Sequence, residues 1–280
     1  MSLRVGTRDL RRHPPGRTRG RFCHVTAQLP PIVVFDLDDT LAPSKTELPG
    51  PIVRALGELL SRTQVCVISG GQFGQFRKQV IAPLEEFGVT HLDQLHLMPA
   101  CGTQYYRHVD GQWSRVYLEA LTDDEKTRAK ASLERCARRL GLWESHTWGA
   151  PIEDRDSQIT FSALGQEAPV NAKRSWDPTG EKKLALREAV AAELPDLEVR
   201  AGGSTSVDIT RVGRDKSFGM EKLMESTGLS KEDLLFYGDR LDVHGNDYPV
   251  KAMGVPCLAV RDWQDTVAKL EELLGAEPVA

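Results

Sequence analysis

Three carboxylates follow an apolar run near the start of the chain. Val33 to Phe35 lead into Asp36 and Asp38, and Asp39 comes directly behind them. Like charges placed this close repel one another, so either a cation lies among them or the segment is an ordinary acidic turn. Carboxylate oxygens are the ligands that Mg²⁺ prefers, so the first alternative predicts a magnesium site.

Two further apolar runs end in polar residues that could join this cluster. One ends at Ser69 and is followed by Gly70 and Gly71, and a later one ends at Gly238 and Asp239. In an open parallel sheet, ligands bind beyond the carboxyl ends of the strands. If these runs are neighbouring strands, all of these residues meet in one crevice.

A phosphate ester in that crevice would give each residue type a role. One of the two leading aspartates can attack phosphorus, and its neighbour two positions along can protonate the leaving oxygen. The Ser69 hydroxyl and the glycine N–H groups can hold phosphoryl oxygens, and Lys216 can supply positive charge. Taken singly, the glycines could form a plain turn, and a lysine is more often a solvated helix residue.

The elements that must position these residues alternate along the chain. Strand-like and helix-like patterns alternate from about residue 31 to 118 and again from about 213 onward. This order predicts an α/β fold with a doubly wound parallel core formed by residues 30–118 and 213–280. Residues 119–212 read instead as an inserted α+β module, an antiparallel sheet with two helices over the strand ends.

The first 29 residues differ from the rest in composition. They carry seven Arg and one Asp, with no apolar periodicity and no apolar segment of the secretory type. We expect a disordered basic extension here and exclude it from the fold.

Bulk composition narrows the class of protein. The formal net charge of -4 gives no electrostatic case for nucleic-acid binding. No run approaches the roughly 18 apolar residues of a membrane span. The five cysteines include no CxxC pair, which is typical of a protein in the reducing cytoplasm.

In combination, these motifs resemble the haloacid dehalogenase superfamily of phosphotransferases. Its DxDxT motif is matched by Asp36, Asp38 and Thr40, its strand-end Ser by Ser69 and its Lys by Lys216. The resemblance implies that Asp36 is the nucleophile and Asp38 the acid/base. It also implies a Mg²⁺ cofactor bound by Asp36, the Asp38 carbonyl and three residues of the acidic motif that starts at Gly238, namely Asp239, Asn246 and Asp247.

The inserted module looks like the cap of one branch of that superfamily, which includes eukaryotic-type phosphomannomutases and Cof-like sugar-phosphate phosphatases. "GGSTSVDITRVGRDK" is similar to the mutase segment that joins cap to core. The resemblance implies that a sugar phosphate, the expected partner, contacts Lys45, Gly70, Arg155, Lys173, Ser206 and Asp208.

Two departures from the mutase pattern favour hydrolysis. Gln166 stands where the mutases have a cap Arg, and an amide cannot replace a bidentate phosphate clamp. Asp39 stands where many relatives have Gly, and its charge is unfavourable near phosphate unless it points away. We therefore expect a Mg²⁺-dependent phosphatase of a phosphorylated sugar or similar metabolite. A phosphohexomutase and a catalytically silent sugar-phosphate sensor remain alternatives, and the oligomeric state stays open, with a homodimer through the cap as one choice.

Overall fold

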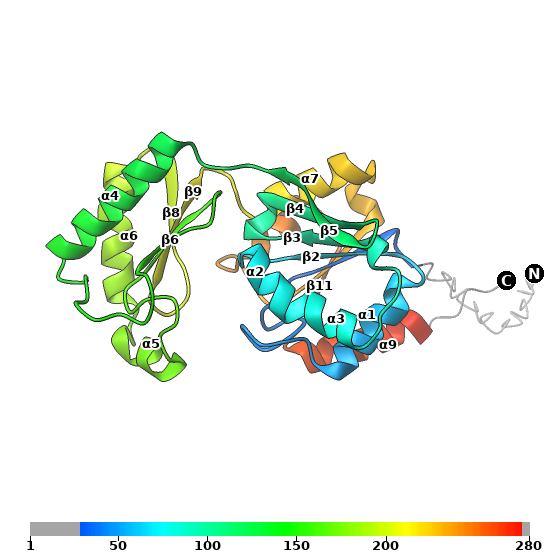
Figure 1. The fold of residues 1–280 in the computed structure, drawn as a ribbon. Helices are drawn as coiled ribbons and strands as arrows, with labels where there is room; N and C mark the ends of the chain where they lie inside the picture. Colours follow the sequence, from blue (N-terminus) through cyan, green and yellow to red (C-terminus); the bar gives the residue numbers. More distant parts are fainter. Residues whose placement is uncertain (1–28, 276–280) are drawn as a thin grey trace, which may run out of the picture.

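The computed structural model describes residues 29–275, which form two lobes (Figure 1). The basic extension expected over residues 1–29 lies outside this described range except for its last residue. Below, the core denotes residues 29–118 and 213–275, and the cap denotes residues 119–212.

The core is built on a seven-stranded sheet in the order β11-β10-β1-β2-β3-β4-β5. The first five strands run parallel, which confirms the predicted α/β class, but the β4–β5 hairpin adds two antiparallel strands, so the sheet is mixed. The strands are β1 (Ile32–Phe35), β2 (Gln64–Ile68), β3 (Leu95–Met98), β4 (Gln104–Val109), β5 (Gln112–Leu118), β10 (Leu234–Gly238) and β11 (Cys257–Ala259).

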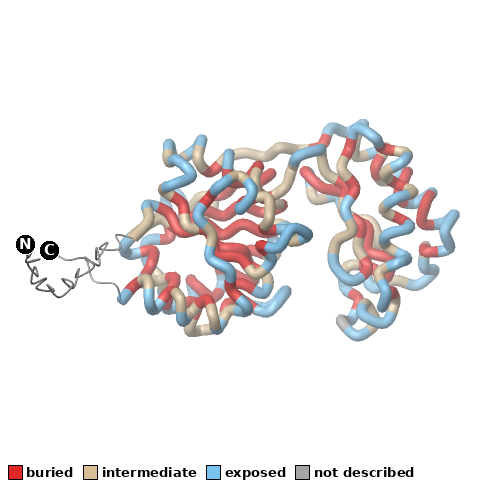
Figure 2. The backbone as a smooth tube through the Cα atoms, turned by 180° about the vertical axis from the view of Figure 1, so that it is seen from behind, coloured by how far each residue is buried: buried red, intermediate tan, exposed pale blue. Residues whose placement is uncertain are grey.

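The side chains of β1 alternate between two apolar clusters, one on each face of the sheet. Val33 and Phe35 pack with α1 (Gly50–Leu60) and α9 (Trp263–Gly275), whereas Ile32 and Val34 pack with α7 (Lys216–Thr227) and α8 (Tyr248–Ala252). A strand buried on both faces has no polar positions, as its sequence indicated. Figure 2 shows these buried strands between more exposed helices.

The helices of the core cover both faces of the sheet. One face carries α1 (Gly50–Leu60), α9 (Trp263–Gly275) and a continuous helix made of α2 (Phe73–Phe76), a π-helical segment (Arg77–Ile81) and α3 (Ala82–Glu86). The other face carries α7 (Lys216–Thr227) and α8 (Tyr248–Ala252). Three short 3₁₀ segments lie at Leu92–Gln94, Ala100–Gly102 and Lys231–Asp233.

The cap is a four-stranded antiparallel sheet in the order β6-β7-β9-β8. Helices α4 and α6 cover one face of it, and the other face turns toward the core (Figure 1). The elements are α4 (Asp123–Arg139), β6 (Ile152–Asp154), β7 (Ile159–Ser162), α5 (Val170–Trp176), α6 (Glu181–Glu193), β8 (Leu197–Ala201) and β9 (Ser206–Arg211).

The expectation of two helices in this module was wrong, because α5 is a third. It has seven residues and lies between Pro169 and Asp177. A helix of two turns shows too little apolar periodicity to be distinguished from a loop in the sequence.

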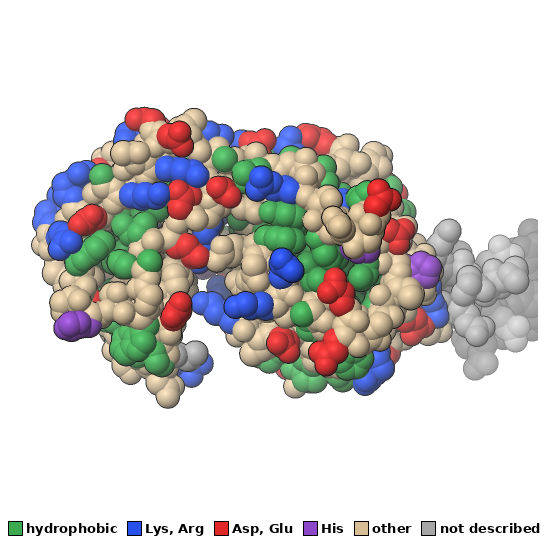
Figure 3. Space-filling view, in the orientation of Figure 1, with side chains coloured by type: hydrophobic (Ala, Val, Ile, Leu, Met, Phe, Trp, Pro, Cys, Tyr) green, Lys and Arg blue, Asp and Glu red, His purple; other side chains and the backbone are tan. Residues whose placement is uncertain are grey.

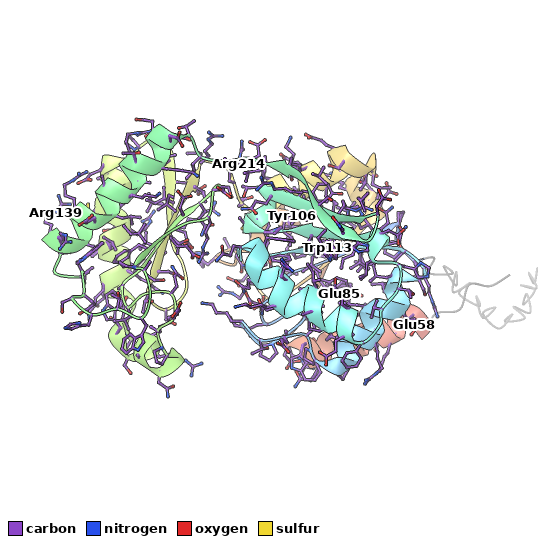
Figure 4. The ribbon with its side chains drawn as sticks, in the orientation of Figure 1. Glu58, Glu85, Tyr106, Trp113, Arg139 and Arg214 are labelled. Atoms are coloured by element: carbon purple, nitrogen blue, oxygen red, sulfur yellow. The ribbon has the colours of Figure 1, made fainter. Side chains whose placement is uncertain are left out.

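Two chain segments join the cap to the core. Arg214 lies on the second of them, between the lobes (Figure 4). Its guanidinium stacks over the Phe218 ring at 4.1 Å and pairs with Glu119 on the first segment at 3.5 Å.

Among the described residues, no helix is long and apolar enough to cross a membrane.

Candidate active site

A polar cavity of about 530 Å³ lies between the carboxyl ends of the core strands and the open face of the cap sheet. Figure 3 shows the hollow between the lobes, with basic side chains beside it. The core contributes Asp36, Asp38, Asp39, Ser44, Lys45, Ser69, Gly70, Gly71, Gln75, Asp239, Arg240, His244 and Asn246. The cap contributes Arg155, Thr160, Ser162, Gln166, Ala201, Gly202, Gly203, Ser206 and Asp208.

Asp36 lies at the base of this cavity in an ion-paired cluster. It follows β1, whose last residue is level with Val67 of β2 and Tyr237 of β10, so the polar ends of these strands lie side by side. The Lys216 ammonium donates to Asp36 Oδ1 and Asp247 Oδ1, each at 2.5 Å, and all three side chains are buried.

The electrostatics of this cluster follow from its burial. Burial raises the pKa of Asp36 to about 7, the Lys216 charge opposes the rise, and the Asp247 charge adds to it. Burial disfavours the Lys216 ammonium, but the two carboxylates outweigh it and raise the lysine pKa. Lys216 therefore stays protonated between the two acids.

Asp36, Asp239 and Asp247 together could hold a metal ion. Each offers a carboxylate oxygen, and these oxygens all lie within 4.8 Å of one another. Asp239 is half-buried, and burial followed by the Asp247 charge raises its pKa. Three carboxylates lie around a single ammonium, so negative charge is in excess. Carboxylate oxygens in this number suit a hard divalent cation. Gly238 permits the close approach, since a Cβ there would fall 2.4 Å from Asp247 Oδ2.

The segment after Asp36 holds the second aspartate of the motif in place. Asp38 Oδ1 accepts the Lys45 backbone N–H at 2.7 Å. Asp39 adopts a left-handed φ of 64°, and its Oδ1 accepts the Ser44 N–H at 3.2 Å. Asp39 also lines the cavity, so the turn that engages its Oδ1 does not remove its charge from the site.

The end of β2 forms a second side of the cavity. Ser69 is buried, and its Oγ accepts the Gly71 N–H at 3.2 Å. Gly70 and Gly71 line the cavity without side chains, which leaves the backbone accessible to a ligand.

The cap contributes a hydroxyl-rich wall from alternating positions of β7 and β9. Thr160 Oγ1 donates to Asp208 Oδ1 at 2.8 Å, and Ser162 and Ser206 are paired across the two strands. Burial raises the pKa of Asp208, while the Thr160 hydrogen bond and the Arg155 charge oppose the rise. Such a wall can exchange hydrogen bonds with a polyhydroxylated ligand.

Arg155 enters the cavity from the turn between β6 and β7. Its guanidinium pairs with Glu153 at 2.7 Å, and Glu153 also accepts from Gln72 of the core at 2.7 Å. The arginine is thus oriented by the cap and by a contact across the cleft.

Gln166 also lines the cavity, beside Arg155. Its Oε1 accepts from Arg155 at 3.4 Å, whereas its Nε2 is buried and has no hydrogen-bond partner among the described residues. Lys173 lies behind it and is not among the lining residues; its ammonium donates to the Gln166 carbonyl at 2.8 Å. Burial, and then the Lys45 charge, lowers the Lys173 pKa.

Sequence reasoning placed most of the cavity residues but missed several. Thr160 and Ser162 had a visible signal, because polar residues alternate with Ile159 and Phe161 in "SQITFSAL". Gln75 and Arg240 gave none, since they lie in polar stretches where a solvated face is the usual outcome.

Sequence comparisons agree with this geometry. A family model described as eukaryotic phosphomannomutase matches residues 53–276. The phosphomannomutase of Saccharomyces cerevisiae is 24% identical over 254 residues, covering 87% of this chain and 94% of the yeast protein. Human phosphomannomutase 1 is 23% identical over 265 residues, covering 88% and 93% of the two chains.

Solved structures with the same fold include a nucleotidase and a haloacid dehalogenase-like hydrolase. The ATP-bound IMP-nucleotidase of Plasmodium falciparum aligns with a TM-score of 0.70 at 17% identity, covering 90% of this chain and 62% of that one. A haloacid dehalogenase-like hydrolase from Bacteroides thetaiotaomicron aligns at 0.60 and 15% identity, covering 86% and 98%. Because the family model matches most of its length and the yeast relative is covered almost end to end, this enzyme belongs to the eukaryotic phosphomannomutase family.

Proposed function

We propose that the protein is a Mg²⁺-dependent phosphatase that hydrolyses a phosphorylated sugar or similar small metabolite through an aspartyl-phosphate. The observation that carries this proposal is Gln166, a neutral amide in the cavity wall of a family whose reaction requires retention of a second phosphate. The remaining site residues support the chemistry of phosphoryl transfer itself.

Asp36 is the proposed nucleophile. One of its oxygens forms a bond to phosphorus while the bond from phosphorus to the substrate oxygen breaks. Water then forms a bond to phosphorus, the Asp36–phosphorus bond breaks, and inorganic phosphate leaves. Burial at the base of the cavity shields Asp36 from solvent, so the nucleophile is not deactivated by a full hydration shell.

Asp38 is the proposed general acid and base. It donates a proton to the departing substrate oxygen and later takes one from the attacking water. The hydrogen bond from the Lys45 N–H engages Oδ1, which leaves Oδ2 to carry this proton.

Ser69, the N–H groups that follow it and Lys216 are the proposed phosphoryl-binding groups. Their positive charge and donors can stabilise oxygens that gain charge during transfer. A divalent cation bound by Asp36, Asp239 and Asp247, with Asn246 nearby, would supply further positive charge for the same oxygens.

The cap is the proposed sugar-binding half. Ser206, Asp208 and Thr160 offer donors and acceptors to sugar hydroxyls, and Arg155 and Lys45 offer charge to an anionic group. These contacts would fix the distance of the substrate from Asp36.

A mutase needs one more property than a phosphatase. It must hold a sugar bisphosphate while that molecule reorients within the site. During that time the cap must bind the distal phosphate and exclude water. The Gln166 amide offers hydrogen bonds about half as strong as those of a charged donor. An intermediate held this weakly would leave, and water would reach the aspartyl-phosphate.

Phosphomannomutase activity is the second candidate, and the family match favours it. Lys45 and Arg155 line the cavity, and Lys173 donates to the backbone carbonyl of Gln166 in its wall. If these cations retain a bisphosphate, Gln166 does not prevent isomerisation. A silent sensor is disfavoured, because it would have no need of the intact nucleophile, acid and lysine.

The proposal is tested with a panel of sugar phosphates and p-nitrophenyl phosphate, recording phosphate release and isomerisation in the same reactions. Phosphate release from the panel, with little isomerisation, supports the phosphatase. Isomerisation without release would support the mutase, and no turnover of any compound would support the sensor.

A further inference from the structure

The loop of residues 43–48, here called the Lys45 loop, connects the aspartate motif to α1, and Leu48 at its end is the residue that packs in the apolar core. Its residues Pro43 to Glu47 are exposed. Lys45 has a left-handed φ of 62°, a conformation that a residue with a long side chain rarely adopts. Yet this conformation presents the Lys45 N–H to Asp38 at 2.7 Å. The loop therefore needs an external anchor.

Gln79 provides that anchor from the π-helical segment. The side-chain Nε2 of Gln79 donates to the Thr46 carbonyl at 2.6 Å. The backbone carbonyl of Gln79 accepts the Leu48 N–H at 2.9 Å. Within residues 29–275, these two bonds are the hydrogen bonds that tie the Lys45 loop to any residue outside 38–48.

A buried amide at position 79 lowers the stability of the fold, so stability alone does not explain why Gln79 is present. Gln79 is 3% exposed and lies in the helix between Phe76 and Val80, both buried in the apolar core cluster. Its Oε1 has no hydrogen-bond partner among the described residues, which costs about 1–3 kcal/mol. A methionine of similar length would avoid this cost.

The π turn gives this helix one residue more than a regular turn, and such turns are frequent at functional sites.

We infer that Gln79 is a positioning residue for the proposed reaction: by holding the Thr46 carbonyl with its side-chain amide, it keeps the Lys45 N–H on Asp38 and so fixes the acid that protonates the leaving group. Gln79 itself is not among the residues that line the cavity. This inference rests on the proposed phosphatase activity, because it assigns Gln79 to the acid step of that reaction.

The test uses Gln79→Met and compares two substrates that differ in their need for a proton. p-Nitrophenyl phosphate has a good leaving group and needs little protonation, whereas an alkyl phosphate such as glycerol phosphate needs it fully. Because kcat/KM reports the first irreversible step, it isolates attack by Asp36 and departure of the alcohol. A positioned general acid contributes about 10²–10⁴-fold, so we expect kcat/KM for the alkyl phosphate to fall at least tenfold. The value for the aryl phosphate should fall less than threefold.

The matched control is Gln64→Met, which removes an amide hydrogen-bonded to His96 at 2.8 Å. Gln64 is the first residue of β2, at the end of the strand away from Ser69 and the cavity. This variant should leave the ratio of the two kcat/KM values unchanged. Hydrogen exchange gives a readout independent of turnover: the amides of Lys45 and Thr46 should exchange faster in Gln79→Met and not in Gln64→Met.

Equal loss on both substrates, or no loss on either, would overturn the inference while leaving the phosphatase proposal in place. Absence of turnover of either substrate by the wild type would instead contradict the phosphatase proposal. If Gln79→Met does not fold, Gln79→Asn keeps the amide but is one methylene too short to reach Thr46. It should give the same substrate-dependent loss.

Discussion

Lys216 Nζ lies 2.5 Å from Asp36 Oδ1, although 180 residues separate the two in the chain. Both side chains are buried, so this pair joins the two halves of the core that flank the cap. An uncompensated charge at this depth would cost several kcal/mol, so Lys216 lowers the cost of ionising Asp36, while Asp36 and Asp247 together keep Lys216 protonated. The catalytic chemistry proposed here depends on this pair and on the acids that surround it.

Replacing Asp36 by Asn should abolish turnover, because an amide oxygen does not form a stable bond to phosphorus. The fold should persist, since Asn fills the same space and Lys216 retains Asp247 as a partner. Phosphate release and circular dichroism measured together test this outcome. Appreciable turnover by a folded Asp36→Asn enzyme would refute covalent catalysis by this residue.

Removal of divalent cations with a chelator should stop turnover, and Mg²⁺ should restore it. Asp239→Asn should raise the Mg²⁺ concentration for half-maximal activity at least tenfold, because one of three close carboxylates becomes neutral. It should also reduce the rise in Tm that Mg²⁺ produces in the wild type. Asp242→Asn is the control, since this exposed carboxylate pairs with Arg240 at 3.0 Å in the same loop. Unchanged Mg²⁺ dependence in Asp239→Asn would place the cation elsewhere.

The buried His96 should make the protein less stable in mild acid. Burial, and next the Arg107 charge, lowers its pKa from 6.5 to about 3. Between these values the unfolded chain binds a proton that the folded protein does not. The free energy of unfolding is therefore highest with respect to His96 above pH 6.5, and it falls as the pH drops toward 3.

The His96→Gln variant removes this proton. From pH 6.5 to pH 5 the wild type should lose roughly 2 kcal/mol more than the variant, as measured by urea unfolding. His146→Gln, at an exposed position, should lose as much as the wild type. Parallel losses in all three proteins would show that His96 is not held neutral.

Gly219→Ala should destabilise the core where α7 crosses the segment Ala100–Gly102. A Cβ at Gly219 would fall 2.4 Å from Ile68 Cδ1 and 2.9 Å from the Cys101 carbonyl. Overpacking of this kind costs about 1–3 kcal/mol, and moving α7 would also displace Lys216 from Asp36. Gly74→Ala, where a Cβ meets nothing within 4 Å, is the control for thermal unfolding and activity. Equal Tm values for the two variants would contradict the tight crossing.

The sequence predicted the site on the core side well, because it depends on strand ends. Apolar runs followed by Asp36, Ser69 and Asp239 indicate buried strands and their carboxyl edge, and the parallel register places these residues together. The mixed character of the sheet was less visible, since a hairpin can add to an edge or stand apart with the same local pattern.

Features that depend on tertiary contact could not be predicted. Gln79 looks like any polar residue of an amphipathic helix, and only the structure shows its amide on Thr46. Glu153 and Gln72 lie 81 positions apart, so their contact across the cleft has no local signal. The position of Lys173 behind Gln166, rather than on the cavity wall, is likewise set by how α5 packs.

This member of the family is proposed to hydrolyse its substrate because Gln166 does not retain a bisphosphate. The most direct measurement follows mannose 1-phosphate by ³¹P NMR in the presence of a sugar bisphosphate activator, which resolves isomer and inorganic phosphate in one sample. The wild type should produce inorganic phosphate in large excess over mannose 6-phosphate. Gln166→Arg should raise the ratio of isomer to phosphate at least tenfold, while Gln166→Met, which adds no charge, should not. Wild-type turnover dominated by mannose 6-phosphate would contradict the account.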